Sequence, residues 1–474
     1  MPTSRPGSVN ARRALGLVAL WAAACLDDGN PITPPAVTGP LVTYAAVAPG
    51  PHNVLSAVVS LELADADSVI VWYRLDDTAA ARDNVTPAFP ARQDSVTVPV
   101  LGLFPGRPYV LAAVVYGPGG ITRSDSLHLT TDTLPDDLPS FTASGPDPAP
   151  GYIAFSAGRY ALVIDNTGRV VWYRAFALGP GLNFQPQPTG RYVARPPTPD
   201  PSDREPWVEL DVLGNVTRTL DCVGGVLPRF HDMIAEAGGS YWIMCDDTRA
   251  MDLSAVGGVV NAQVTGTVIQ HVDAAGQLLF AWNPFDHFAI TDLDSAGRAG
   301  PTVNWTHGNA LDLDTDGNLL VSFRSLSEIT KIDTRSGAVL WRMGGRRNQF
   351  LFAAPGVPFS RQHGLRAVAP GQIALLDNLG EPSGSRGERY AVDEATRRAS
   401  LLTWYASTPA TTAQLGGTTQ GIGTHTLVSY GNGNRVEEYD AAGRVVWRIE
   451  GDPGYVFRAT RIRSLYAPVA GATR

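Results

Sequence analysis

One pattern of apolar and polar residues recurs along the C-terminal two thirds of the chain. Each copy has an apolar strand, an Asp, two or three further residues, a Gly, and a second apolar strand that usually ends in Trp. The six copies begin at Asp165, Asp211, Asp273, Asp333, Asp393 and Asp440. The second copy lacks the Trp and the fifth lacks the Gly. Asp caps tight turns and Gly supplies a positive φ, so each copy predicts a β-hairpin.

The copies start 46 to 62 residues apart, which leaves room for four strands and a loop in each. A repeat of this length, built from strands, is typical of the blades of a propeller. The chain is therefore predicted to be all-β, with a six-bladed β-propeller over residues 151–474.

Shorter alternating strands occupy residues 41–133, for example 69–73 and 109–115. Residues 100–109 resemble the strand-to-strand segment of fibronectin type III domains, in which a Leu and a Tyr anchor a corner of the sandwich. A small β-sandwich is expected here, followed by a Pro- and Asp-rich linker over residues 134–150.

The N-terminus has the pattern of an export signal. Arg12 and Arg13 precede an apolar stretch, residues 14–24, that is too short for a membrane-spanning helix, which needs about 20 residues. The sequence Ala22-Ala23-Ala24-Cys25 resembles a lipobox, which implies a signal peptide over 1–24, lipidation of Cys25 and a tether over 25–40. Ala22 stands where Leu is usual, so an Ala-x-Ala cleavage site is the alternative. The expected location is periplasmic or at the cell surface, with a lipid anchor in the membrane.

Composition narrows the range of partners. The chain has 37 basic and 45 acidic residues, a net charge of −8, and no Lys/Arg block, so nucleic-acid binding is not expected. Beyond Cys25, only Cys222 and Cys245 remain. In an exported protein this pair is predicted either to form a disulfide or to be two buried free thiols. The cysteine spacing indicates no metal site.

Histidines recur at one place in four of the predicted blades. They lie just before or at the start of strands, at His231, His307, His363 and His425. The innermost strands of a propeller surround a central channel, so such residues converge on one mouth. A single histidine in a repeat is more often structural, but four in register predict a functional site.

Short motifs around these histidines resemble the bacterial aryl-sulfate sulfotransferases, and the resemblance covers roughly residues 150 to 455. The motifs are Phe230-His231-Asp232, Trp305-Thr306-His307-Gly308-Asn309-Ala310, Ser322-Phe323-Arg324-Ser325 and Arg361-Gln362-His363-Gly364. The resemblance implies that His363 is a nucleophile that becomes transiently sulfated. It implies that His231, His307 and Arg324 surround the sulfate, and that Asn309 and His425 bind substrate.

Imidazole suits this chemistry, because its neutral form attacks and its N-sulfonate is a reactive donor, giving two ping-pong steps. A proton donor such as His231 or His307 would help the phenolate leave, and Arg324 could hold the sulfonate oxygens. The expected partners are a phenolic sulfate donor and a phenol acceptor, with no cofactor; a homodimer is possible.

Several alternatives stay open. A related propeller could pass the group to water as a sulfate-ester hydrolase, or a non-catalytic lipoprotein could bind glycans or proteins. Residues 312–317 match the start of a Ca²⁺ loop, but Phe323 stands where Glu is required, which favours a plain hairpin turn. His287 could line the rim of the mouth, although loop packing is the favoured interpretation, and His271 is expected to be peripheral.

Overall fold

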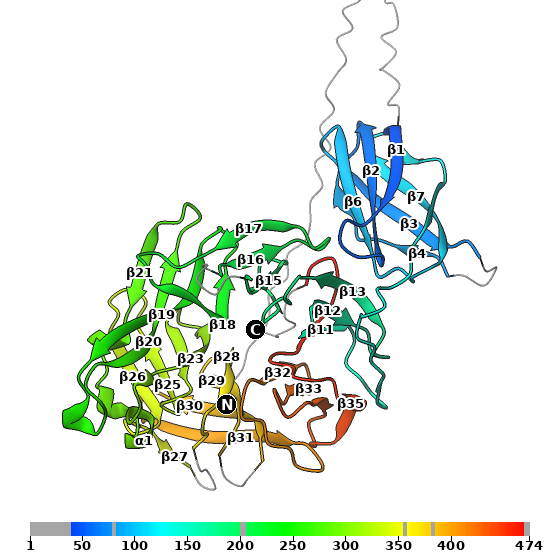
Figure 1. Cartoon of the computed structure of the whole chain (residues 1–474). Coiled ribbons are helices and arrows are strands. Elements are labelled where there is room, and N and C mark those ends of the chain that lie inside the picture. Colours follow the sequence, from blue (N-terminus) through cyan, green and yellow to red (C-terminus); the bar gives the residue numbers. More distant parts are fainter. Residues whose placement is uncertain (1–38, 78–81, 200–204, 354–357, 381–383, 469–474) are drawn as a thin grey trace, which may run out of the picture. The chain divides into compact units, whose positions relative to one another are not determined.

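The computed structural model describes residues 39–77, 82–199, 205–353, 358–380 and 384–468. The predicted signal peptide and Cys25 lie outside the described residues, as does nearly all of the predicted tether. Figure 1 shows that the described chain is built almost entirely of β-strands, as expected. Within these ranges, no helix is both long and apolar enough to cross a membrane.

Two sheets are formed by residues 41–130. The first contains β1 (Leu41–Pro49), β2 (Ser56–Ala64) and β6 (Ser95–Leu101). The second contains β3 (Ser68–Leu75), β4 (Asn84–Val85), β5 (Phe89–Pro90), β7 (Pro108–Gly117), β8 (Gly120–Arg123) and β9 (Leu127–Thr130). Alternate residues of both sheets, such as Val59, Val71 and Leu111, share one apolar core. The Tyr109 hydroxyl accepts a hydrogen bond from the Phe104 N–H at 2.8 Å and so holds the loop before β7.

Six antiparallel sheets of four principal strands follow in chain order in the described residues. The first three consist of β36 (Thr460–Ile462), β11 (Tyr152–Ala157), β12 (Tyr160–Ile164) and β13 (Val170–Ala175); β14 (Gln185–Pro186), β15 (Tyr192–Ala194), β16 (Trp207–Leu210) and β17 (Val216–Leu220); and β18 (Leu227–Ala235), β19 (Tyr241–Met251), β20 (Ala262–Val272) and β21 (Leu278–Trp282).

The last three consist of β23 (Gly308–Leu313), β24 (Leu319–Phe323), β25 (Glu328–Ile332) and β26 (Val339–Gly344); β28 (His363–Ala369), β29 (Gln372–Asp377), β30 (Arg386–Asp393) and β31 (Arg398–Ala406); and β32 (Thr418–Ile422), β33 (His425–Ser429), β34 (Val436–Tyr439) and β35 (Val445–Ile449). Short strands β10 (Ala143–Ser144), β22 (Thr302–Asn304) and β27 (Leu351–Phe352) pair with β35, β20 and β31. The short helices are η1 (Ser254–Val256), η2 (Pro284–Asp286), η3 (Ile290–Asp292) and α1 (Ser295–Arg298).

The six sequence repeats form the outer hairpin of each of these sheets, joining its last two strands. In the first repeat, the Asp165 carboxylate accepts the N–H groups of Thr167 and Arg169, while Gly168 has φ +90°. All six outer hairpins contain a register shift. The fifth repeat, which lacks the Gly, places Arg397 at φ +53° instead. The Asp carboxylate and the positive φ therefore explain why the motif marks a turn.

The two ends of this region complete its first and last sheets. β36, near the C-terminus, pairs with β11, and β10 pairs with β35. The range predicted as a linker thus contains a strand, and Phe141 packs in the core beneath it. In the order given above, the first strands of the six sheets are β36, β14, β18, β23, β28 and β32. Each of these strands lies beside the next one, and β32 lies beside β36. The six first strands therefore form a closed series.

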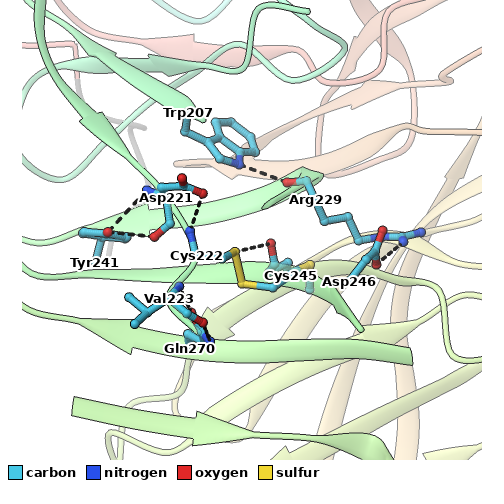
Figure 2. Close-up of a disulfide and its surroundings, with 10 residues drawn as sticks. Trp207, Asp221, Cys222, Val223, Arg229, Tyr241, Cys245, Asp246 and Gln270 are labelled. Atoms are coloured by element: carbon cyan, nitrogen blue, oxygen red, sulfur yellow. Dashed lines mark hydrogen bonds and ion pairs between the residues drawn. A yellow bond between two sulfur atoms is a disulfide. The ribbon is translucent and has the colours of Figure 1, made fainter. Parts of the chain in front are cut away.

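A disulfide connects the second and third sheets. Cys222, which follows β17, is bonded to Cys245 of β19 with an S–S distance of 2.01 Å (Figure 2). Beside it, the Trp207 indole donates to the Arg229 carbonyl at 2.9 Å, and the Arg229 guanidinium pairs with Asp246 at 2.6 Å. These contacts restrain β18, the strand that carries His231.

Candidate active site

Three of the four predicted histidines gather where neighbouring first strands meet. His231 lies on β18, His307 immediately precedes β23, and His363 begins β28. The Nε2 atoms of His231 and His307 are 3.2 Å apart. The Phe457 ring contacts both sides of the cluster, with its centroid 5.9 Å from that of His231 and 6.3 Å from that of His363.

Each of the three strands is irregular at its histidine. Pairing shifts register between Pro228 and Met233 on β18 and between Gly308 and Ala310 on β23. It shifts again on β28 just after His363. His307 also adopts φ +49°, a conformation that non-glycine residues rarely adopt. Bulges re-aim side chains and are common beside active sites, so the local backbone turns these imidazoles toward one another.

The hydrogen bonds of Asn378 determine the tautomer of His363. The Asn378 Nδ2 donates to the carbonyls of Ala413 and Gly416, at 2.8 and 3.0 Å. Carbonyls only accept, so the Asn378 Oδ1 must face the Nδ1 of His363, at 2.8 Å. Nδ1 therefore carries the hydrogen, and Nε2 of the neutral ring holds a free lone pair.

The other two histidines form a pair that shares one hydrogen. Two lone pairs cannot face each other at 3.2 Å, so one Nε2 donates to the other. The Nδ1 of His307 lies 2.7 Å from the Asn304 amide, whereas the buried Nδ1 of His231 has no partner among the described residues. The pair can accept or release a proton without large movement.

Burial and positive charge keep all three imidazoles neutral. Burial, followed by Arg229, holds the pKa values of His231 and His307 well below the ordinary range. Burial, opposed by the Asn378 hydrogen bond and reinforced by Arg324, lowers the pKa of His363 to about 4. At neutral pH the cluster presents uncharged nitrogen bases.

Arginines provide the positive charge around the cluster. Arg324 lowers the pKa of all three histidines, and Arg361 lowers that of His307. Arg324 donates through Nη2 to the Gln414 carbonyl at 3.1 Å, while its Nε has no partner in the described part of the chain. A cationic setting with an unused guanidinium donor suits an anionic group such as a sulfate ester.

Of the remaining two predicted residues, Asn309 lies beside the cluster and His425 lies away from it. Asn309 is buried and donates to the Gln362 carbonyl at 2.7 Å, so it holds the segment before His363. His425 begins β33, the second strand of its sheet, which is antiparallel to β32. It therefore lies at the opposite end of the sheet from the start of β32. Its Nδ1 bonds the Glu438 carboxylate at 2.7 Å.

The competing motifs have structural roles. Residues 314–317 form the turn between β23 and β24, and the carboxylates of Asp314 and Asp316 pair with Lys331. His287 stacks on Trp282 and His271 on Trp242. In the described ranges, no group of three or more His, Cys, Asp and Glu side chains could hold a metal ion.

Sequence reasoning missed four residues of this site. Asn378 and Phe457 come from the fifth sheet and the C-terminal segment, and no repeat or motif marks them. Arg229 and Arg361 each lie two residues before a site histidine, a shared spacing that was available as a signal.

The chain is remotely similar to several solved structures. A protein of unknown function from Bacteroides caccae is 12% identical, covers 67% of this chain and 100% of its own, and has a TM-score of 0.43. A catalytically inactive virginiamycin B lyase from Staphylococcus aureus is 9% identical, with coverages of 64% and 87% and a TM-score of 0.35.

The search of curated proteins finds no match to the chain. Residues 226–452, which contain the three clustered histidines and Arg324, match the family model described as Arylsulfotransferase (ASST).

Proposed function

We propose that the protein is an aryl-sulfate sulfotransferase that moves a sulfuryl group from a phenolic sulfate ester to a phenol through a sulfated His363. The family match over residues 226–452 supports arylsulfotransferase activity. The observation that carries the mechanism is the Asn378 contact, because it leaves Nε2 of a neutral His363 as a nucleophile.

In the first half-reaction, Nε2 of His363 attacks the ester sulfur. An N–S bond forms as the S–O bond to the aryl group breaks, and the electron pair leaves on the phenolate oxygen. Arg324 would hold the sulfonate oxygens. The bound anion raises the pKa of the His231–His307 pair, so the pair can take up a proton and deliver it to the phenolate.

The second half-reaction reverses these steps with a different phenol. The acceptor oxygen attacks sulfur, the N–S bond breaks, and its electron pair returns to Nε2 of His363. The phenolic proton passes to the His231–His307 pair. No nucleotide is consumed, because the ester itself carries the transferable group.

The test is to incubate purified protein with a chromogenic aryl sulfate, with and without phenol, and to record intact-protein mass spectra. We expect wild type to gain one SO₃ and to lose it when phenol is added, and His363→Ala to form no adduct and no product. His287→Ala is the matched control, because His287 stacks in a loop on Trp282.

The outcomes separate the alternatives. Full turnover by His363→Ala would remove the nucleophile assignment. Sulfate release that needs no phenol would favour a hydrolase. Absence of both adduct and phenolate release from wild type would favour a non-catalytic binding protein.

We also propose a domain plan: signal peptide 1–24, tether 25–40, fibronectin III-like sandwich 41–133 and six-bladed propeller 151–474, with β10 of the predicted linker 134–150 added to the last sheet. The closed series of first strands supports the propeller, and the shared core of the first two sheets supports the sandwich.

We propose that the protein is exported and lipid-anchored through Cys25. The oxidised Cys222–Cys245 pair supports an oxidising compartment. Labelling of expressing cells with radioactive palmitate should mark wild type but not Cys25→Ala; equal labelling of both would exclude this anchor.

A further inference from the structure

A cavity lies along the same first strands, beyond the histidines. It has a volume of about 490 Å³ and is lined by residues that follow the site histidines in sequence, including Met233 on β18 and Arg366 on β28. None of the three histidines lines it. The first strands β18, β23 and β28 run from the histidines toward this cavity, so the cavity lies farther along these strands.

Buried ion pairs separate the cavity from the histidines. The Asp232 carboxylate, fully buried and adjacent to His231, contacts Arg366 at 2.8 Å and Arg458 at 3.2 Å. Arg366 and Arg458 both line the cavity. Two guanidinium groups share this one carboxylate, which leaves an excess of positive charge on the cavity side.

The remaining charged lining residues increase this excess. Arg389 adds a third guanidinium group. The two lining carboxyl groups are poor counter-ions: burial raises the pKa of Asp312 and raises that of Glu388 to about 7. Glu388 also pairs with Arg386, which does not line the cavity.

Two of the lining arginines have donors that no protein group uses. The Nε atoms of Arg389 and Arg458 are buried and have no hydrogen-bond partner in the described residues. Three guanidinium groups with two poor counter-ions give the lining an excess of positive charge, which favours an anion.

Apolar side chains complete the lining. Pro186, Met233 and Tyr405 face the same cavity. A pocket of this size with apolar walls and a few convergent charged groups is typical of small-molecule sites. We propose that this cavity binds a small organic anion at a site distinct from the histidine cluster. Arg389 and Arg458 hold the charged group of the anion, and the apolar lining side chains contact its apolar body.

The test uses isothermal titration calorimetry of the full purified protein with benzoate, and with benzamide as an uncharged analogue of similar shape. We expect benzoate to bind with a 1:1 stoichiometry and benzamide to bind at least about tenfold more weakly. Benzamide has no charge, and the loss of a single charge-assisted hydrogen bond already raises Kd about tenfold or more. Arg389→Gln and Arg458→Gln should each weaken benzoate binding at least about tenfold. Arg335→Gln, an exposed arginine on a hairpin turn, is the matched control and should bind like wild type.

Arg389 is only partly buried, so Arg389→Gln keeps the test informative if Arg458→Gln fails to fold. His363→Ala should retain benzoate binding, which separates this site from the proposed catalytic one. The inference is overturned if benzoate does not bind wild type, if benzamide or inorganic sulfate binds as tightly as benzoate, if both arginine variants bind normally, or if His363→Ala abolishes binding.

Discussion

At the scale of single residues, the function of the site depends on where hydrogens lie. The burial of His363 alone does not show which of its ring nitrogens carries the hydrogen; the hydrogen bonds of Asn378 decide this. Both Nδ2 hydrogens of Asn378 are used by carbonyls, so its oxygen is the only group left to meet the His363 ring. Asn378 is therefore a positioning residue for the proposed nucleophile.

Replacing Asn378 tests this role. Asn378→Leu removes the acceptor, so the His363 ring is no longer held in the reactive tautomer, and kcat should fall about 10- to 100-fold with little change in KM. Asn378→Asp restores an acceptor and should recover part of kcat. Its carboxylate also raises the pKa of His363, so the acid limb of the pH–rate profile should move to higher pH.

A merely structural role for Asn378 would lower the stability of both variants without moving the pH profile. Steady-state kinetics from pH 4 to 8, together with thermal melts of each variant, distinguish the two cases.

The depressed histidine pKa values also predict how stability depends on pH. The unfolded chain binds protons at these histidines below about pH 6.5, whereas folded His363 binds one only near pH 4. The folded state is therefore fully favoured above pH 6.5 and loses stability as the pH falls toward 4, by on the order of 3 kcal/mol for His363.

Urea unfolding at pH 7, 5.5 and 4.5 measures this loss. His363→Asn removes one titrating group and should reduce the dependence on pH. An equal dependence in this variant and wild type would show that burial does not hold the imidazole neutral.

At the scale of elements, the outer hairpins show how far local sequence reasoning extends. Asp and Gly identify five turns directly, because carboxylate capping and positive φ are local requirements. The fifth hairpin also has a residue with positive φ at its turn, Arg397 at φ +53°. An arginine does not favour this conformation, so the pairing of β30 with β31 maintains it.

Two of these glycines differ in surroundings and form a matched pair. At Gly168, an added Cβ would lie 2.6 Å from the Phe141 carbonyl oxygen, whereas at Gly276 it would meet nothing within 4 Å. Both have positive φ. Gly168→Ala should therefore lower the free energy of unfolding by about 1 to 3 kcal/mol more than Gly276→Ala, measured by urea denaturation. Equal losses would mean that residues 141–143 do not pack on this turn.

At the scale of the whole molecule, the first and last sheets are joined by a buried ion pair. Arg461 of β36 and Glu438 of β34 are 2.6 Å apart and both fully buried, and His425 bonds the same carboxylate. The family resemblance implied substrate binding for His425; the structure places its side chain at this closure.

Breaking the pair should be costly. Arg461→Met leaves the Glu438 carboxylate buried with only the His425 imidazole and the Ala149 N–H as hydrogen-bond partners among the described residues, and should lower the free energy of unfolding by about 3 to 5 kcal/mol. The double variant Arg461→Met/Glu438→Gln removes the stranded charge and should lose less. Additive losses in this double-mutant cycle would show that the two groups do not interact.

The sequence alone predicted the strand content, the six outer hairpins and the three histidines that cluster, because turn chemistry and motif residues act locally. Only the tertiary structure decided that β36 and β10 complete the first and last sheets, that Asn378 holds His363, and that His425 lies away from the cluster. These outcomes depend on contacts between segments far apart in the chain. For His425, the deciding fact is the direction of its strand, because β33 runs antiparallel to β32 and so begins at the end of the sheet that is remote from the site.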